Sequence, residues 1–260
     1  MNVQYPPDIN ITDENGSILT ETTIEGASYS ARCNVDANPT DNLNLKWEFQ
    51  DNTIYNGALL ELQQVNRDQA GIYNCVAENM FYDGTKGYGS QSIDIDVQFP
   101  PSVEVMLSDA VAKEGTSLTL ACNVIDSNPV DVDFSWILAD GTEYDEAVVD
   151  IVAVTRELNG NQSCSATNTF YDGSHGMGMN IIHLDVQYIA TINMSVQPSN
   201  EVMKSSFVRI TCTVLDGNPN PYKLKLTLTA MKLLKLRDLS LYMKYMVLKQ
   251  APLVTTCVRQ

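Results

Sequence analysis

Short stretches of alternating polar and apolar residues recur through the first part of the chain and predict β-strands. Four such stretches in the first third are Ala27–Val35, Leu43–Phe49, Gly57–Val65 and Gly71–Asn79. Because successive side chains of a strand point to opposite faces of a sheet, this alternation is typical of half-buried strands. The Asn38-Pro39 step between the first two predicts a turn, since proline fixes its own φ and keeps the preceding residue out of the helical region.

The segment Ser92–Phe99 ("SIDIDVQF") has the clearest alternation in the chain. Its isoleucines and valine fall on one face, and Asp94 and Asp96 fall on the other. A later strand repeats the same inward face with Ile182, Leu184 and Val186. The pattern therefore predicts an all-β protein with sheets that bury one face.

Several phrases return at a nearly constant interval. "FYDGTKGYG" at Phe81–Gly89 is followed 89 residues later by "FYDGSHGMG" at Phe170–Gly178. Asn-Pro occurs three times, and "VQYPP" at residues 3–7 returns as "VQFPP" at 97–101 and as "VQYIA" at 186–190. A fixed period indicates a repeat architecture. We expect two complete units, 1–99 and 100–188, and a partial or divergent third unit, 189–260.

The "FYDG" phrase lies between two predicted strands of each unit, so it is expected to form the hairpin that joins them. Asp-Gly is a strong hairpin signal because glycine accepts the positive φ that tight turns require. The glycine pairs that follow, Gly87 with Gly89 and Gly176 with Gly178, suggest a twisted or bulged return strand.

Each complete unit has two cysteines 42 residues apart, with a tryptophan fourteen residues after the first cysteine. Together with "ARCNVDANPT", "RDQAGIYNCVAEN", "ACNVIDSNPV" and the "VQYPP" type linkers, this pattern resembles the immunoglobulin superfamily. More narrowly, residues 1 to about 222 resemble the constant-2 or intermediate-type repeats of adhesion ectodomains such as nephrin, hemicentin and the membrane-proximal part of sialic-acid-binding lectins. The fold class implied is a tandem array of immunoglobulin-like β-sandwiches, with the third domain incomplete or aberrant.

The resemblance also implies roles for particular residues. Disulfides would join Cys33 to Cys75 and Cys122 to Cys164, with Trp47 and Trp136 packed against them in the cores. Tyr73 stands where such domains keep a tyrosine that caps a corner, whereas the second unit has Gln162 there, which suggests a looser corner. Cys212 and Cys257 form a candidate third pair. The alternative is that the cysteines are reduced and buried.

Paired cysteines favour an extracellular compartment, because disulfides persist outside the cell and are rare in the cytosol. The candidate N-glycosylation sites, which agree with this compartment, are Asn10, Asn15, Asn161 and Asn193. We see no secretory signal in this chain, and its start at a linker phrase suggests a fragment of a longer membrane or secreted protein.

The third unit departs from the pattern. The position fourteen residues after Cys212 is Leu226 instead of tryptophan, and the tail from about residue 223 is basic and leucine-rich. A shifted reading frame or an alternative terminal exon is one explanation, and a divergent third domain is the other. Lysines and an arginine interrupt every apolar run in the tail, so we expect no direct membrane insertion by this segment. A basic amphipathic surface helix is a further alternative.

The chain carries a net charge of −16, and an acidic body makes nucleic acid an unsuitable partner. His175 and His183 are the only histidines, and neither lies in a pattern that provides a nucleophile, so we expect no enzyme and no cofactor. Acidic residues around 131–146 could hold calcium, but no loop of known ligand spacing is present, and we expect no metal site.

Candidate contact residues flank the two hairpins: Tyr82, Tyr88, Tyr171 and Met177. Tyrosine is favoured at interfaces, although these side chains could instead pack on their own hairpin or on a neighbouring domain. The most consistent interpretation is an extracellular cell-adhesion or recognition module that binds a protein partner, homophilic or heterophilic, without catalysis. The alternatives are a spacer array of the extracellular matrix, an intracellular muscle-type array, and a truncated gene model or isoform without a separate function.

Overall fold

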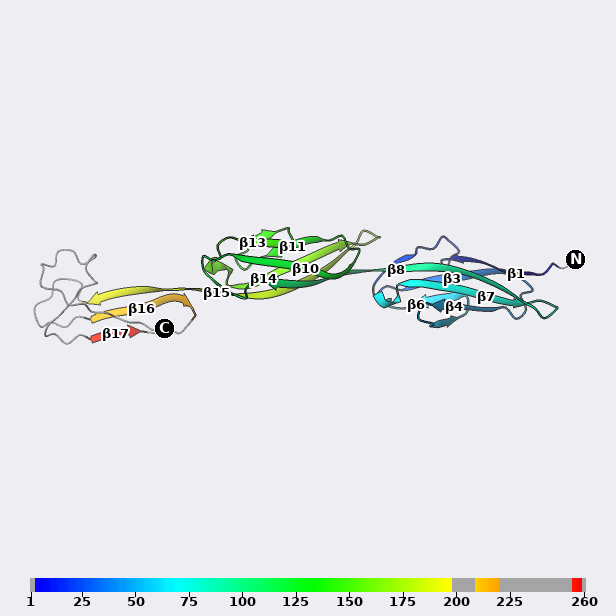
Figure 1. Cartoon of the computed structure of the whole chain (residues 1–260), viewed down its shortest axis with the longest axis horizontal. Helices are drawn as coiled ribbons and strands as arrows, with labels where there is room; N and C mark the ends of the chain where they lie inside the picture. The colour runs from blue at the N-terminus through cyan, green and yellow to red at the C-terminus, as the bar shows by residue number, and fades with distance from the viewer. Residues whose placement is uncertain (1–2, 198–208, 220–253, 259–260) are drawn as a thin grey trace, which may run out of the picture. The chain divides into compact units, whose positions relative to one another are not determined.

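The computed structural model describes residues 3–197, 209–219 and 254–258, and almost all of their regular structure is β-strand. Among these residues the only helices are two single 3-10 turns, η1 (Arg67–Gln69) and η2 (Arg156–Leu158). The strands form tandem immunoglobulin-like sandwiches (Figure 1). The all-β prediction is confirmed.

Eight strands build the first sandwich. One sheet has the order β1-β3-β6, and in the other sheet β8, β7, β4 and β5 are successive neighbours while β2 runs parallel to β8. The strands are β1 (Tyr5–Thr12), β2 (Thr22–Ile24), β3 (Tyr29–Asn38), β4 (Asn44–Phe49), β5 (Ile54–Asn56), β6 (Leu59–Leu62), β7 (Gly71–Met80) and β8 (Lys86–Leu107).

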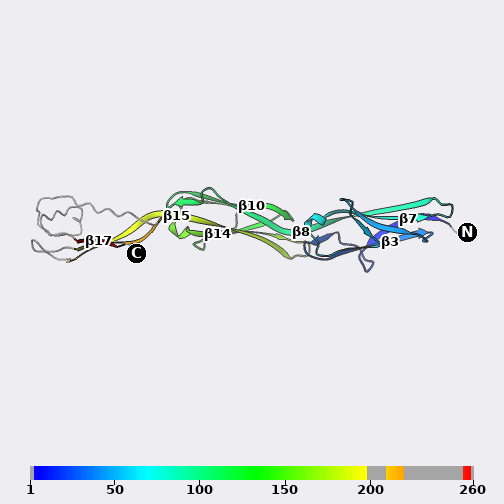
Figure 2. The ribbon, with the colours of Figure 1, turned by 90° about the horizontal axis from the view of Figure 1, so that it is seen from below.

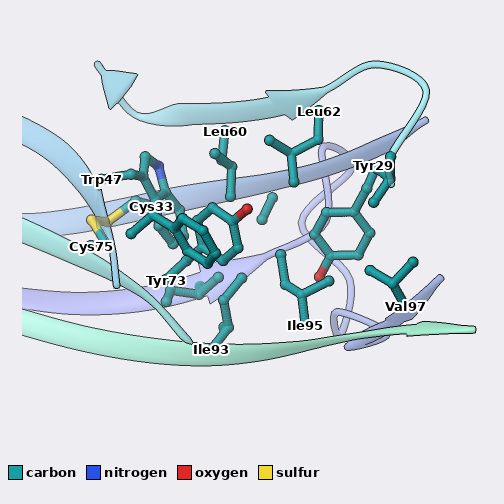
Figure 3. Packing of buried hydrophobic residues seen from close by; sticks show 14 residues of the cluster. Tyr29, Cys33, Trp47, Leu60, Leu62, Tyr73, Cys75, Ile93, Ile95 and Val97 are labelled. Atoms are coloured by element: carbon teal, nitrogen blue, oxygen red, sulfur yellow. A yellow bond between two sulfur atoms is a disulfide. The ribbon is translucent and has the colours of Figure 1, made fainter. Parts of the chain in front are cut away.

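The core of the first sandwich lies between its two sheets. A disulfide joins Cys33 on β3 to Cys75 on β7, and Figure 3 shows Trp47 beside it. Trp47 is fully buried, and its indole N–H donates to the carbonyl of Ala58 at 3.2 Å. The apolar faces of β6 and β8 close the core from opposite sides (Figure 3). Burial of these alternating positions is what the sequence pattern predicts.

Tyr73 is fully buried near the corner formed by η1. Its hydroxyl donates to the carbonyl of Gln69 at 3.1 Å, and burial raises its pKa well above the ordinary value. At the equivalent place in the second sandwich, Gln162 is buried and accepts a hydrogen bond from the backbone N–H of Ala139 at 3.0 Å. Gln162 therefore binds the turn that follows β11 (Asp133–Ile137), whereas Tyr73 binds the 3-10 turn η1.

The second sandwich repeats this construction. The disulfide Cys122–Cys164 is formed. Trp136 is fully buried, and its backbone pairs with that of Cys164 across β11 and β14. Trp47 pairs with Cys75 in the same way in the first sandwich. The strands are β9 (Val111–Lys113), β10 (Leu118–Asn128), β11 (Asp133–Ile137), β12 (Glu143–Tyr144), β13 (Val148–Ile151), β14 (Gly160–Thr169) and β15 (His175–Gln197).

The phrases taken as linkers lie inside long strands. Residues 97–101 belong to β8 and residues 186–190 to β15, which are labelled in both views (Figures 1 and 2). β8 pairs with β7 through its first part and is also a neighbour of β10, so the chain passes from one repeat to the next without leaving a sheet. The proposed domain bounds 1–99, 100–188 and 189–260 stay a prediction.

Two described strands follow β15. β16 (Arg209–Asn218) pairs antiparallel with β15, and β17 (Val254–Val258) pairs parallel with β16, with the backbones of Cys212 and Cys257 in register. The side chains of these two cysteines and the basic tail, residues 223–253, lie outside the described part of the chain. The candidate third disulfide and the nature of the tail therefore stay predictions.

Candidate contact surface

Each "FYDG" phrase forms a tight hairpin turn. In the first, the backbone N–H of Phe81 donates to the carbonyl of Thr85 at 2.8 Å, and Gly84 has a positive φ of 84°. Asp83 accepts hydrogen bonds from the backbone and the hydroxyl of Thr85 at 2.9 and 2.6 Å, which holds the pKa of that carboxyl below its ordinary value. Asp172 makes the same two bonds with Ser174 in the second hairpin.

The glycines after each turn are explained by close packing against the preceding linker. A Cβ atom on Gly87 would overlap the side chains of Asn79 and Phe81 and lie 3.0 Å from the Cα of Pro6, and one on Gly89 would overlap the carbonyl oxygen of Pro7. The second hairpin repeats these contacts, with Gly176 and Gly178 against Pro100 and Pro101. The β7–β8 register is unbroken from Gly71 to Met80. The expected bulge is therefore absent from this pair, and the glycines are small because the Pro-Pro segment passes directly over them.

Hydrogen bonds also join each hairpin to the linker against which its glycines pack. Gln98 accepts from the backbone N–H of Tyr171 at 2.7 Å, and Gln4 accepts from Tyr82 at 3.3 Å. Asn168 donates to the carbonyls of Phe99 and Pro129, as Asn79 donates to those of Tyr5 and Pro39. The repeated phrase therefore recognises the repeated linker through its backbone and its glycines.

The candidate contact side chains point away from these linker contacts. Tyr82 and Tyr88 are 70% and 61% exposed in the first hairpin, and Tyr171 and Met177 are 54% and 63% exposed in the second. Since the turn, the glycines and the backbone bonds make the linker contacts, these four side chains remain available to solvent. Two of these residues belong to each hairpin or its return strand.

Three further apolar side chains were missed by the sequence reasoning. Met179 and Ile181 follow Met177 at every second position of β15, which puts all three on one face of that strand. Ile137 on β11 faces the same way, because its neighbour Trp136 pairs with the buried Cys164. Met177, Met179, Ile181 and Ile137 are each 50–63% exposed. We call these four residues the apolar face.

Small polar residues separate Ile137 from the β15 positions of the apolar face. The outward residues of the intervening strand β14 include Ser163, Ser165 and Thr167, and none of them is charged. Their side chains are half-buried. Two exposed carboxylates border the apolar face, because Glu143 on β12 pairs with Ile137 and Asp133 on β11 pairs with Thr167.

The equivalent face of the first sandwich is charged. Lys46 and Glu48 form an ion pair of 2.6 Å on β4, and Lys86 and Glu78 form another of 2.6 Å across β8 and β7. In the 89-residue repeat, Glu48 corresponds to Ile137 of the second sandwich. The other replacements are Ser135 for Lys46, Thr167 for Glu78, His175 for Lys86, Met179 for Ser90 and Ile181 for Ser92.

All four candidate glycosylation asparagines are exposed: Asn10, Asn15, Asn161 and Asn193. The side-chain oxygen of Asn161 lies 3.1 Å from a ring nitrogen of His183, which is itself exposed. Attachment of sugar to any of them stays a prediction. Their exposure leaves each side chain accessible to modification.

The part of the chain that the structure describes contains no cluster of three or more His, Cys, Asp or Glu residues suited to a metal ion. Within the same residues, no helix is both long and apolar enough to cross a bilayer.

No family model matches the chain. It is 27% identical over 230 residues to human myelin-associated glycoprotein, aligning 85% of this chain with 33% of that protein. It is 24% identical over 229 residues to mouse cell surface glycoprotein MUC18, aligning 80% of this chain with 35% of that protein. The chain thus spans about a third of the length of these curated relatives.

Among solved structures, the chain is similar to the N-terminal eight immunoglobulin domains of Down syndrome cell adhesion molecule isoform 1.30.30, at 21% identity and a TM-score of 0.47. That alignment covers 85% of this chain and 29% of the other. The two disulfide-bonded sandwiches have the immunoglobulin-like fold, and the chain is similar in sequence to these cell-surface glycoproteins.

Proposed function

We propose that the chain is an extracellular adhesion or recognition module that binds a protein partner through the apolar face of its second sandwich, without catalysis. The similarity to cell-surface glycoproteins supports the class of function. The two disulfides support the compartment, because such bonds persist in oxidising surroundings.

The difference between the two repeats carries the proposal. The first sandwich covers this sheet face with two ion pairs, which suit a surface that stays in water. The second sandwich replaces those four charges with Ser135, Ile137, Thr167 and His175 and adds Met179 and Ile181. Its charges on this side, Asp133 and Glu143, lie beside the apolar face as single carboxylates. Exposed apolar patches of this kind mark interaction sites, since covering them releases about 25 cal/mol per Å² of apolar surface.

The chemistry of the apolar face suits a protein partner. Methionine side chains are flexible and polarizable, so Met177 and Met179 can adapt to an apolar surface of varied shape. The serines and threonine of β14 are small enough to let a partner approach closely and can form hydrogen bonds with it. A standard interface buries about 800 Å² on each partner, so the exposed Tyr171 hairpin supplies a natural extension of the contact.

The proposal is tested by a matched pair of substitutions. Met179→Lys puts a charge in the apolar face, and Ser90→Lys puts the same charge at the equivalent position of the first sandwich. Beads coated with the full chain would be assayed for self-aggregation and for retention on cells from the source tissue. Self-aggregation of the beads reports homophilic binding, and retention on cells reports heterophilic binding.

We expect Met179→Lys to weaken binding at least about tenfold, since an unpaired buried charge costs more than the 1.4 kcal/mol that corresponds to a factor of ten. Ser90→Lys should bind as the unchanged chain does. Equal binding by both variants would contradict the proposed use of the apolar face.

A spacer function is the alternative that the linkers support. The Pro-Pro segment of each linker is packed under a glycine-bearing hairpin, which favours a chain that holds its repeats in sequence. If beads coated with the unchanged chain neither aggregate nor bind cells, the spacer function replaces the adhesive one.

A further inference from the structure

An arginine of the first 3-10 turn fastens the end of the first sandwich to the residues that follow it. Two nitrogens of Arg67 donate to the carboxylate of Glu25 at 3.0 and 2.8 Å, and a third donates to Asp126 at 3.2 Å. Its guanidinium carbon lies 3.8 Å from the ring centroid of Phe99. The bidentate bond to Glu25 orients the arginine, so its remaining nitrogen and its flat face are directed at Asp126 and Phe99.

The second 3-10 turn repeats this arrangement. Arg156 donates to both carboxylate oxygens of Glu114 at 2.9 Å and to Asp216 at 3.3 Å, and its guanidinium carbon lies 4.4 Å from the ring centroid of Tyr188. We call each set of arginine, glutamate, aromatic and aspartate a clasp. The first lies within one compact unit of the chain and the second within the other.

The receiving half of a clasp consists of an aromatic and an aspartate, which we call a socket. The aromatic is the third residue of a "VQY" or "VQF" phrase, and the aspartate stands two residues before an Asn-Pro step. In the second socket the hydroxyl of Tyr188 donates to Asp216 at 2.8 Å. Asn218 fixes the socket by donating to the carbonyl of Val186 at 2.8 Å.

A third socket stands on the first sandwich. Tyr5 follows Val3 and Gln4, Asp36 stands two residues before Asn38, and the hydroxyl of Tyr5 donates to Asp36 at 2.9 Å. The side chain of Asn38 donates to the carbonyl of Val3, as Asn218 does to Val186.

The backbone of this third socket matches the second as well. Tyr5 pairs with Asn38 and Tyr188 pairs with Asn218, and in both cases the register shifts directly after the aromatic. Tyr5 and Asp36 therefore match the second socket, which binds Arg156, in residue type, hydrogen bonds and register. Among the described residues, no ion pair or stacked cation is found at Tyr5 or Asp36.

We propose that Tyr5 and Asp36 form a socket for an arginine on the 3-10 turn of another immunoglobulin-like domain, joined through the Val3–Pro7 phrase. Stacking on an aromatic face suits the flat guanidinium of arginine, and the aspartate accepts from the remaining N–H, as Asp126 and Asp216 do. The exposed fractions of the aromatic side chains support this proposal. Phe99, which is covered by its arginine, is 8% exposed, whereas Tyr5 is 37% exposed. This binding surface is separate from the apolar face.

The test supplies such a domain in the natural spacing. A second copy of residues 3–96 is placed directly before Val3 of the full chain, so that the appended Asp96 is followed by Val3, Gln4 and Tyr5. The appended copy carries Tyr5→Phe, which leaves a single Tyr5 in the extended chain. Hydroxyl-radical labelling of Tyr5 is then measured by peptide mass spectrometry, with Tyr171 as the internal reference.

Two variants of the appended copy distinguish protection of Tyr5 by Arg67 from protection by the mere presence of a neighbouring domain. Arg67→Ala removes the arginine of the clasp, and Arg32→Ala removes the same charge from strand β3 as a matched control. A non-reducing peptide map showing Cys33 linked to Cys75 in both copies verifies that each version is folded.

We expect labelling of Tyr5 to fall several-fold in the extended chain, to recover with Arg67→Ala and to stay low with Arg32→Ala. Equal labelling of Tyr5 in the original and extended chains would overturn the proposal. Protection that survives Arg67→Ala would overturn it too, because the covering would then not depend on the arginine.

Discussion

Replacing Gly89 with alanine tests whether the repeated hairpin is shaped by its linker. Alanine in a strand is ordinarily more stable than glycine by about 0.5–1 kcal/mol, because glycine loses more backbone entropy on folding. At this position a Cβ atom would overlap the carbonyl oxygen of Pro7 and lie 3.1 Å from its Cβ. The structure therefore predicts the opposite sign.

The magnitude follows from the atoms that must move. The overlapping atom belongs to the backbone of Pro7, which cannot rotate away as a flexible side chain could. Overpacking of this kind costs about 1–3 kcal/mol, and subtracting the entropic gain leaves a net destabilisation of about 0–2.5 kcal/mol. The overlap with a backbone atom favours the upper part of that range, and for a domain of this size each 1 kcal/mol corresponds to a fall in Tm of roughly 4–8 °C.

Each sandwich contains one tryptophan, so its unfolding can be followed separately. In a Trp136→Phe background, fluorescence reports Trp47 and hence the first sandwich alone. Gly89→Ala should lower the thermal midpoint, while Ser90→Ala, at the next and exposed position, should leave it unchanged. Gly178→Ala, read through Trp136 in a Trp47→Phe background, should reproduce the effect against Pro101. A midpoint that rises with Gly89→Ala would refute the reasoning.

Three further predictions concern the cores and the clasps. Tyr73→Phe removes the bond to the carbonyl of Gln69 and should lower the free energy of unfolding by about 1 kcal/mol, whereas Tyr171→Phe, at an exposed position, should change nothing in the same urea titration. Replacing Cys122 and Cys164 with alanine opens a link between residues 42 apart and should cost about 4 kcal/mol; an unchanged urea midpoint would show that the bond is not formed. Arg67 lowers the pKa of Glu25 by hydrogen bonding, so its contribution is present above the ordinary pKa of that carboxyl and is lost as the pH falls through the lowered value. The destabilisation by Arg67→Ala should therefore be full near neutral pH and shrink as the pH falls below the ordinary pKa of a glutamate, and a constant difference would contradict the assigned partner.

The sandwiches could be predicted from the sequence because their determinants are local and periodic. Alternation with a period of two defines the buried face of a strand, as the inward positions of Ser92–Phe99 illustrate. The spacing of Cys33, Trp47 and Cys75 identifies the two sheets that a disulfide joins. These features need no knowledge of which segments lie side by side.

The linker contacts could not be predicted in this way, because they depend on which segments approach each other. Nothing in "FYDGTKGYG" alone indicates that Pro7 lies over Gly89, and the glycine pairs by themselves predict a twisted or bulged return strand. The linkers themselves were expected between domains, whereas residues 97–101 continue strand β8. Both differences arise from long-range packing.

The apolar face was accessible to sequence reasoning through the repeat itself. Aligning the units at an interval of 89 residues places Ile137 opposite Glu48 and Ile181 opposite Ser92. The hairpin pattern points to Met177 alone, because the other three residues lie on the strands outside that phrase. Comparison of outward positions between the repeats shows the loss of both ion pairs, with Glu143 paired with Ile137 where the first sandwich has Ile54 paired with Glu48.

The most direct test of the proposed contact uses the methionines of the apolar face as reporters. The chain would be exposed briefly to hydrogen peroxide while free and while bound to cells that retain it, and sulfoxide would be measured at each methionine. Met177 and Met179, which are 63% and 59% exposed, should be protected in the bound chain, while Met80 and Met106, at 44% and 46%, should oxidise at their free rates. Oxidation of Met177 and Met179 at unchanged rates in the bound chain would contradict the account.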